Sequence, residues 1–331
     1  MKKVFFVHNH LSEFVRLDLA ELQKHHPVTE CYLQSRWVNP IALWRQVARH
    51  DLVFGWFASW HTFLPILIAK ILGKPSVLVI GGYDVANMPE IGYGHNRGGL
   101  SKWVSRQAMT FASRLTAPST FSRDEAVNNA GIASERIQTI YLGVPDPFGE
   151  LPQKPRARMA LTVGNVNQSN LRRKGHEAFV QAAALMPDAR FVLVGDWKDD
   201  AINHLRSIAS PNVTFTGRLS DEELLDHYRQ SAVYVQPSRH EGFGLSVAEA
   251  MLAGCVPVVT RSGALPEVTG ECGVFVESNE PTAIAAGIER ALALPDRARE
   301  AIRQRILDCF PMEKRGENLA QLIRPLMNGS H

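Results

Sequence analysis

The sequence predicts an α/β protein of two doubly wound domains, and three observations support this. Its 331 residues exceed what one hydrophobic core usually holds. Short apolar runs alternate with amphipathic stretches in both halves, which is typical of parallel sheets covered by helices on both faces. A segment rich in Gly and Pro, residues 143–155, separates the halves and favours neither helix nor strand. We expect domains at 1–145 and 156–311, and a helix at 312–327 that could pack back on the first domain.

The expected elements alternate in the order that such domains need. In the first half we predict strands at 3–7, 51–56, 76–80, 115–117 and 138–141, and helices at 14–25 and 61–72. In the second half we predict strands at 159–163, 190–194, 213–216, 232–236 and 256–260, and helices at 175–186, 199–208 and 245–253. A further helix begins at the capping box Ser220-Asp-Glu-Glu223. Doubly wound sheets bind ligands beyond the carboxyl ends of their strands, so the prediction is two Rossmann-like domains facing a central cleft.

Composition excludes several classes of protein. Apolar residues make up 45% and charged residues 21% of the chain, as in ordinary globular proteins. A formal charge of +3 is too small to indicate a nucleic-acid partner. The longest apolar stretch, residues 63–72, is interrupted by Lys70, so we expect no membrane span. The expected localisation is cytoplasmic, with peripheral contact at the inner membrane face left open.

The most informative segment runs from Pro237 to Ala250 and reads PSRHEGFGLSVAEA. Its glycines let the backbone approach a ligand closely, and the first amides of the helix expected from about Gly244 are free to bind a diphosphate. Glu241 lies before this helix and Glu249 about one turn inside it. Two carboxylates that flank an anion site fit a ligand with hydroxyls on both sides of a diphosphate, such as a sugar nucleotide. The alternative is that both glutamates are solvated surface charges.

This segment resembles the donor signature of the retaining family 4 glycosyltransferases, which have the GT-B fold. Glu241 and Glu249 have that family's Glu-x7-Glu spacing, and GFGLSVAE lies between them. The resemblance implies that Glu241 contacts the donor sugar and that Glu249 binds the ribose. It also implies that the backbone of Phe243, Gly244 and Leu245 holds the diphosphate.

A second region similar to the family opens the carboxyl-terminal domain, with Gly164 and Asn165 after a strand and Arg172-Arg173-Lys174 before a helix. Cations at a helix amino terminus oppose its dipole, so they need an anionic partner or free hydration. In the family an Arg and a Lys clamp the diphosphate here. Lys174 matches the Lys, whereas Asn165 stands where the Arg is usual. Arg172 or Arg173 is then the candidate replacement.

Two further loops have family counterparts. Gly217 and Arg218 follow a strand, in the loop that offers backbone to the nucleotide base in the family, although turn geometry alone would also explain Gly217. In the first half, Gly81-Gly-Tyr-Asp84 ends a strand, and Gly81 takes the place of a His that contacts the transferred sugar in relatives. Asp84 is therefore our candidate polar group on the acceptor side. Its alternative role is to cap the next turn.

The resemblance implies a retaining, hexosyltransferase-type glycosyltransferase of polysaccharide biosynthesis that moves a sugar from a nucleotide diphosphate to a hydroxyl acceptor. The acceptor could be a glycan, a lipid-linked molecule or a small molecule. The expected catalytic residues are Glu241, Asp84 and Lys174. We expect no cofactor beyond the donor co-substrate, no bound metal and no nucleic-acid partner. The alternatives are a sugar-nucleotide epimerase of the same architecture, which would need more acid/base groups, and a non-catalytic sugar-nucleotide-binding protein.

Overall fold

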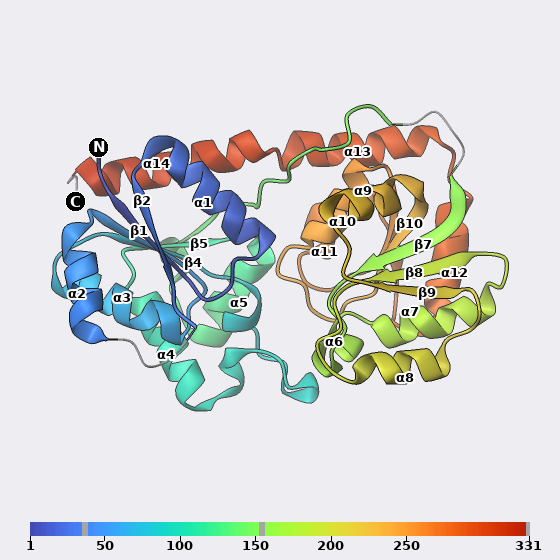
Figure 1. Ribbon diagram of the computed structural model, residues 1–331, viewed down its shortest axis with the longest axis horizontal. Helices are drawn as coiled ribbons and strands as arrows, with labels where there is room; N and C mark the ends of the chain where they lie inside the picture. The colour runs from blue at the N-terminus through green and yellow to red at the C-terminus, as the bar shows by residue number, and fades with distance from the viewer. Residues whose placement is uncertain (35–38, 152–155, 329–331) are drawn as a thin grey trace. The chain divides into compact units, whose positions relative to one another are not determined.

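The computed structural model describes residues 1–34, 39–151 and 156–328 (Figure 1). The chain separates into two compact units. The first unit consists of Met1–Gly143 together with the segment that starts at Met312, and the second is Val144–Pro311. Part of the expected linker, residues 152–155, lies outside the described residues.

The first unit is built on a six-stranded parallel sheet in the order β2-β1-β3-β4-β5-β6. Its central strands are continuous apolar runs because both faces are covered. The edge strand β2 lacks such a run, and the sequence analysis did not predict it. The strands are β1 (Val4–His8), β2 (Val28–Tyr32), β3 (Leu52–Trp56), β4 (Ser76–Val79), β5 (Arg114–Ala117) and β6 (Ile137–Thr139).

Helices cover both faces of this sheet. On one face α2 (Pro40–Arg49), α3 (Trp60–Ile71), α4 (Gly99–Phe111) and α5 (Thr120–Ala130) share a core with the strands. Figure 1 shows α1 (Glu13–His25) and α14 (Met312–Asn328) on the opposite side from α2, α3 and α4. Local sequence sets the helix starts: Asn39 caps α2 by accepting hydrogen bonds from two backbone amides, and Pro40 follows at the first helical position.

A buried ion pair fastens α14 to the rest of the first unit. Arg315 of α14 donates to both carboxylate oxygens of Asp18 in α1, at 2.6 Å each. The Trp56 indole also donates to Asp18, at 3.1 Å, and Arg315 reaches the carbonyl oxygens of Ile140 and Tyr141. Because every charge has a partner, the pair can be held without water.

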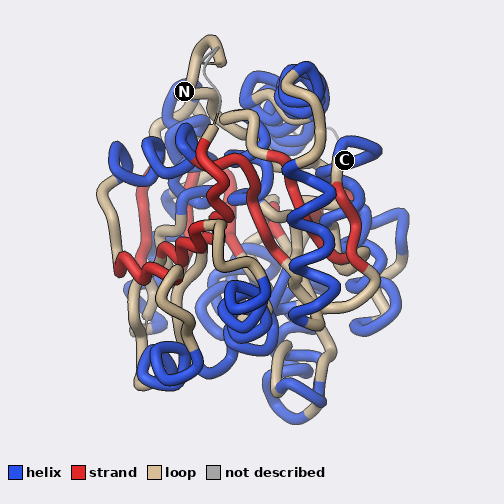
Figure 2. The backbone as a smooth tube through the Cα atoms, turned by 90° about the vertical axis from the view of Figure 1, so that its right-hand side faces the viewer, coloured by secondary structure: helices blue, strands red, loops and turns tan. Residues whose placement is uncertain are grey.

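The second unit repeats the design with a parallel sheet in the order β12-β11-β10-β7-β8-β9. In Figure 2, strands lie between helices on either side. The strands are β7 (Ala157–Val163), β8 (Arg190–Val194), β9 (Val213–Gly217), β10 (Ser231–Gln236), β11 (Val256–Thr260) and β12 (Val274–Val276). The helices are α6 (Gln168–Arg173), α7 (His176–Ala182), α8 (Ala201–Ile208), α9 (Asp221–Gln230), α10 (Leu245–Leu252), α11 (Leu265–Thr269), α12 (Pro281–Leu292) and α13 (Arg297–Cys309).

Three helix ends in this unit follow directly from sequence. The capping box predicted at Ser220 and Glu223 is present at the start of α9. Gly244 precedes α10 with a φ of 99°, and Gly254 follows it with a φ of 78°. Both conformations favour glycine, so α10 is confined to the segment between them. Within the described part of the chain, no helix is long and apolar enough to cross a membrane.

Candidate functional site

The candidate site of the second unit lies beyond the carboxyl ends of β7, β10 and β11. β10 is central in its sheet, and its last residue, Gln236, is followed by the loop that leads into α10. The residues before α7 and those after β11 pack against this loop: the Arg239 amide donates to the Arg173 carbonyl at 2.8 Å, and the Ala264 amide donates to the Glu241 carbonyl at 2.9 Å. Segments distant in sequence thus come together at the carboxyl ends of the central strands.

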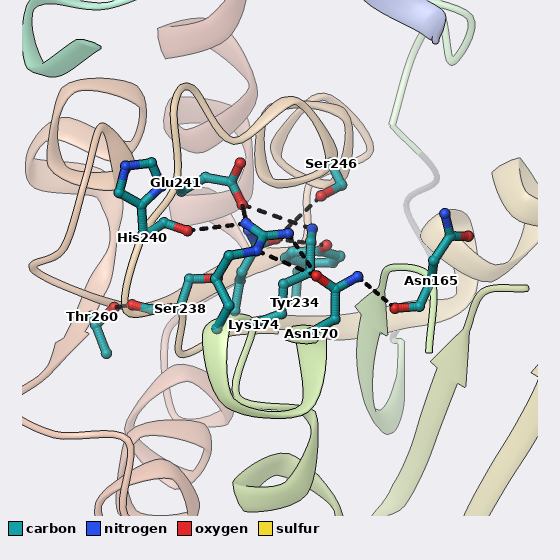
Figure 3. Close-up of polar contacts among 11 residues, drawn as sticks. Asn165, Asn170, Lys174, Tyr234, Ser238, His240, Glu241, Ser246 and Thr260 are labelled. Atoms are coloured by element: carbon teal, nitrogen blue, oxygen red, sulfur yellow. Dashed lines mark hydrogen bonds and ion pairs between the residues drawn. The ribbon is translucent and has the colours of Figure 1, made fainter. Parts of the chain in front are cut away.

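Glu241 is at the centre of this meeting point (Figure 3). Its Oε2 accepts a 2.6 Å hydrogen bond from the Gln236 amide and lies 3.7 Å from Lys174 Nζ and 3.9 Å from Arg173 Nη1. The three charged side chains are only 12–17% exposed. We call Arg173, Lys174 and Glu241 the charge cluster. Within the described residues, Glu241 Oε1 has no hydrogen-bond partner, so it can accept one from a ligand hydroxyl.

Burial and pairing set the charges of this cluster. For Glu241, burial raises the pKa, but Lys174 and Arg173 outweigh it and hold the pKa below the usual range. Burial lowers the pKa of Lys174, and the negative charge of Glu241 opposes that shift. Glu241 is therefore ionised at neutral pH. The two cations against one anion leave the cluster with a net positive charge, which suits an anionic ligand.

The groups that hold Glu241 in place could not be recognised in the sequence. The Gln236 Oε1 accepts hydrogen bonds from the hydroxyls of Tyr234 and Ser246, each at 3.1 Å, so its amide nitrogen is directed at Glu241. Gln236 and Tyr234 are fully buried in β10. Nothing in the sequence distinguishes Gln236 from any polar residue at the end of a strand.

Glycines permit the close packing around the charge cluster. A Cβ on Gly263 would lie 2.4 Å from the Glu241 carbonyl oxygen, and one on Gly175 would lie 2.7 Å from the Pro237 carbonyl oxygen. A Cβ on Gly164 would lie 2.8 Å from Cδ of Lys174. Gly263 and Gly175 would meet backbone atoms and have positive φ angles, so both positions require glycine, whereas at Gly164 the Lys174 side chain would have to shift. Gly263 was another residue that the sequence analysis did not single out.

The start of α10 supplies donors beside the charge cluster. The carbonyl oxygen of Gly244 accepts hydrogen bonds from the amides of Val247 and Ala248. Within the described residues, the amides of Gly244, Leu245 and Ser246 donate no hydrogen bond. Free amides at a helix amino terminus are a general anion site. The side chain of Phe243, just before Gly244, is buried and packs edge-on against Phe310, and the role of its backbone in holding the diphosphate stays a prediction.

Glu249 lies one turn further along α10. Its Oε2 accepts a 2.9 Å hydrogen bond from the hydroxyl of Tyr228, a buried residue at the end of α9. Burial, followed by the nearby Glu249 carboxylate, raises the pKa of Tyr228 well above its usual range, so the phenol stays protonated and donates. This bond fixes the orientation of the carboxylate that the family resemblance assigns to a ribose.

The structure brings some of the other predicted residues to the site and leaves others out. Of the two candidate arginines, Arg173 belongs to the charge cluster, whereas Arg172 is exposed. The Asn165 side chain is also exposed, and its carbonyl oxygen accepts a 2.7 Å hydrogen bond from Asn170. Gly217 ends β9 with a φ of 73° beside Trp197, and Arg218 after it is exposed. Their roles in donor binding stay predictions.

Asp84 belongs to the first unit, where its side chain is buried and fully engaged. One carboxylate oxygen accepts from the Ala58 amide at 2.8 Å and the other from the Gly81 amide at 3.0 Å. Burial raises its pKa to about 7, and these two amides oppose that shift. The carboxylate therefore holds together the loops after β3 and β4. Its catalytic role stays a prediction, and its structural role is explicit.

No group of three or more His, Cys, Asp or Glu residues within the described residues could hold a metal ion.

Comparison with known proteins identifies the family. A family model described as "Glycosyltransferase Family 4" matches residues 4–146, and one described as "Glycosyl transferases group 1" matches residues 157–293. The chain belongs to the group 1, family 4 glycosyltransferases. These two matches cover most of both units, and they do not favour an epimerase or a non-catalytic binding protein.

Curated relatives of this family 4 chain include several transferases. It is 28% identical over 208 residues to O-antigen chain mannosyltransferase B of Escherichia coli, covering 56% of the chain and 53% of the relative. It is 31% identical over 230 residues to a GDP-mannose-dependent alpha-(1-6)-phosphatidylinositol dimannoside mannosyltransferase of Mycobacterium tuberculosis, covering 63% of the chain and 60% of the relative. The matched region thus spans roughly half the length of these relatives.

Solved structures establish the fold of this family 4 chain. HepE of Anabaena, solved with UDP and glucose, aligns with a TM-score of 0.77 at 18% identity, covering 98% of this chain and all of that one. Sucrose-phosphate synthase from Thermosynechococcus elongatus aligns with a TM-score of 0.76 at 19% identity over the full length of both chains. The two Rossmann-like domains therefore have the GT-B fold.

Proposed function

We propose that the chain transfers a sugar from a nucleotide diphosphate sugar to a hydroxyl group of an acceptor, with retention of the anomeric configuration. One observation carries this proposal. The free amides at the start of α10 lie beside a charge cluster in which two cations meet one carboxylate. That combination matches the negative diphosphate and the neutral hydroxyls of such a donor.

The chemistry expected of these groups is stabilisation of the leaving group. When the bond between the sugar and the diphosphate breaks, negative charge grows on the departing oxygen. Preorganised amides and cations near that oxygen stabilise the charge without reorganising, and each such donor is worth roughly 10²–10³ in rate. Lys174, Arg173 and the first amides of α10 are the donors. No side chain is needed as a nucleophile if the acceptor hydroxyl attacks on the side from which the diphosphate leaves and the departing diphosphate oxygen takes its proton, as the family resemblance implies.

Glu241 then orients the sugar. Its Oε2 is held by Gln236 and the two cations, and its Oε1 is available to accept a hydrogen bond from a sugar hydroxyl. Glu249, oriented by Tyr228, is the proposed ribose acceptor. Because the cations already neutralise the leaving group, we expect transfer to continue in excess EDTA.

The experimental test begins by identifying the donor. One relative named above is GDP-mannose-dependent, and the HepE structure holds UDP and glucose, so the panel contains GDP- and UDP-sugars together with ADP- and TDP-sugars. A ligand that binds only the folded chain raises its melting temperature. The donor found in this way is then incubated with acceptors, and release of nucleotide diphosphate is measured. NMR of the product gives the anomeric configuration.

Variants connect the activity with the site. We expect Lys174→Ala and Glu241→Ala each to lower transfer by at least a hundredfold while the chain stays folded. Arg158→Ala and Glu289→Ala are matched controls, because these residues form an exposed ion pair at 2.9 Å in the same unit. Undiminished turnover in both site variants would defeat the proposal. An altered donor sugar without an acceptor product would indicate epimerisation instead, and donor binding without turnover would indicate a binding protein.

A further inference from the structure

Three adjacent helices of the first unit carry an unusual distribution of charge. α2, α3 and α4 contain no Asp or Glu, yet they supply five cations: Arg45, Arg49, Lys70, Lys102 and Arg106. Among the residues that the structure describes, none of these five forms an ion pair. The helices on the opposite side of the sheet differ, because α1 and α14 carry several acidic residues. The part of this side formed by α2, α3 and α4 is therefore positively charged.

The same three helices expose large apolar side chains. Each of these residues is between 41% and 64% exposed. They are Ile41, Trp44, Ile71, Leu100 and Trp103. Folding normally buries residues of this size, and a group of them on one surface indicates an interaction site.

The apolar and basic groups lie on three helices that pack side by side. α2 packs on α3, and α3 packs on α4, and Figure 1 shows the three helices along one side of the sheet. Between α3 and α4, the ring of Phe63 lies 5.8 Å from that of Trp103 and 6.2 Å from that of Phe111. Lys70 Nζ lies 4.6 Å from the centre of the Phe111 ring. We call the exposed surface of α2, α3 and α4 the basic-apolar face.

We propose that the basic-apolar face docks the protein on the surface of a membrane that contains anionic lipids. Exposed Trp and aliphatic side chains insert between headgroups, while Lys and Arg attract the negative surface. The complete lack of acidic residues on these helices favours this occupant, because the charge of an anionic bilayer is uniformly negative. The neighbouring helix α5 carries Asp124 and Glu125, so it marks the limit of the face. Lys74 lies outside the face, because its ammonium group is bonded to the carbonyl oxygens of Ala48 and His50.

Vesicle flotation tests the proposal on the full chain. We expect binding to vesicles of phosphatidylcholine with about a third phosphatidylglycerol, little binding to phosphatidylcholine alone, and release as salt rises from roughly 0.05 to 0.5 M. The charge variant Arg45→Gln/Arg49→Gln should lower the partition coefficient by at least tenfold, at about fivefold per cation. The apolar variant Leu100→Ser/Trp103→Ser should lower it by a similar factor.

Matched control variants distinguish binding through the basic-apolar face from nonspecific adsorption to vesicles. Lys314→Gln/Arg324→Gln removes two exposed cations from α14, and Leu185→Ser/Leu294→Ser removes two exposed leucines from the second unit. Both controls should bind vesicles like the original chain, and all variants should keep its melting temperature within a few degrees. Absence of binding to anionic vesicles would overturn the proposal, as would equal losses in the controls. A dimer that Leu100→Ser/Trp103→Ser converts to a monomer, without vesicle binding in either chain, would assign the face to a second copy and likewise overturn it.

Discussion

Pairing within the charge cluster should be measurable as a coupling energy between Lys174 and Glu241. Their charged atoms lie 3.7 Å apart. At an effective dielectric constant of about 20, two charges at that distance attract by about 4 kcal/mol. Arg173 remains near Glu241 when Lys174 is removed, and both side chains keep some contact with water, so about half of this attraction should be measurable. We therefore expect a coupling of about 2 kcal/mol.

A double-mutant cycle measures this coupling energy. Lys174→Met and Glu241→Gln should each lower the unfolding free energy by about 3 kcal/mol, because each removes an opposite charge from beside a poorly solvated one. The double variant should lose about 2 kcal/mol less than the sum of the two. Urea unfolding can be followed in this unit alone by fluorine NMR of fluorotryptophan-labelled protein, because Trp197 is the one Trp of the six that lies in Val144–Pro311.

The control cycle uses Arg158→Met and Glu289→Gln. These residues form an exposed pair at 2.9 Å, with 44% and 52% of their side chains exposed, so their coupling should stay below about 0.5 kcal/mol. If the Lys174–Glu241 coupling is no larger than that of the control, the charges are solvated independently and the account of the cluster is wrong.

Three other changes have clear expected outcomes. Arg315→Met should lower the unfolding free energy of the first unit by about 3–5 kcal/mol in urea titrations, because it leaves a buried carboxylate in α1 unpaired; a loss below about 1 kcal/mol would contradict this. Burial lowers the pKa of His176 to about 3, so the folded chain should lose stability as the pH falls from about 6.5 towards 3, and His176→Leu should flatten that part of the urea-midpoint profile. Gly263→Ala should abolish donor-induced thermal stabilisation by displacing the Glu241 loop, whereas Gly149→Ala, with a similar φ of 62° and open space around it, should keep it.

Much of the fold could be predicted because buried parallel strands are apolar runs. β8 (Arg190–Val194) and β11 (Val256–Thr260) have the predicted bounds, and every other predicted strand overlaps an observed one, whereas the edge strands β2 and β12 were not predicted. β2 escaped prediction because its sequence, VTECY, exposes Thr29 and Glu30 at the edge of the sheet. A strand with one neighbour needs less apolar surface, so periodicity alone does not reveal it.

The candidate site was only partly predictable. Glu241 and Lys174 stand in recognisable motifs, and the structure brings them together. Arg172 and Arg173 both lie in the last turn of α6, where successive side chains point about 100° apart, so only Arg173 faces Glu241. Gln236 was missed because its role depends on a hydrogen bond from Ser246, ten residues away.

The two possible roles of Asp84 could not be separated from sequence either. Its capping bond to Gly81 is local, but its bond to Ala58 crosses 26 positions of the chain. A single sequence carries no signal for a contact of that range.

The position of α14 affects how the chain acquires its structure during translation. The ribosome produces all of Val144–Pro311 before α14, although α14 belongs with the strands made first. The second unit can complete its fold while the first still lacks its last helix. Asp18 cannot form its ion pair until Arg315, 297 residues further along the chain, has been made. A chain truncated after residue 311 and released from the ribosome should therefore contain a protease-resistant second unit and a protease-sensitive first one.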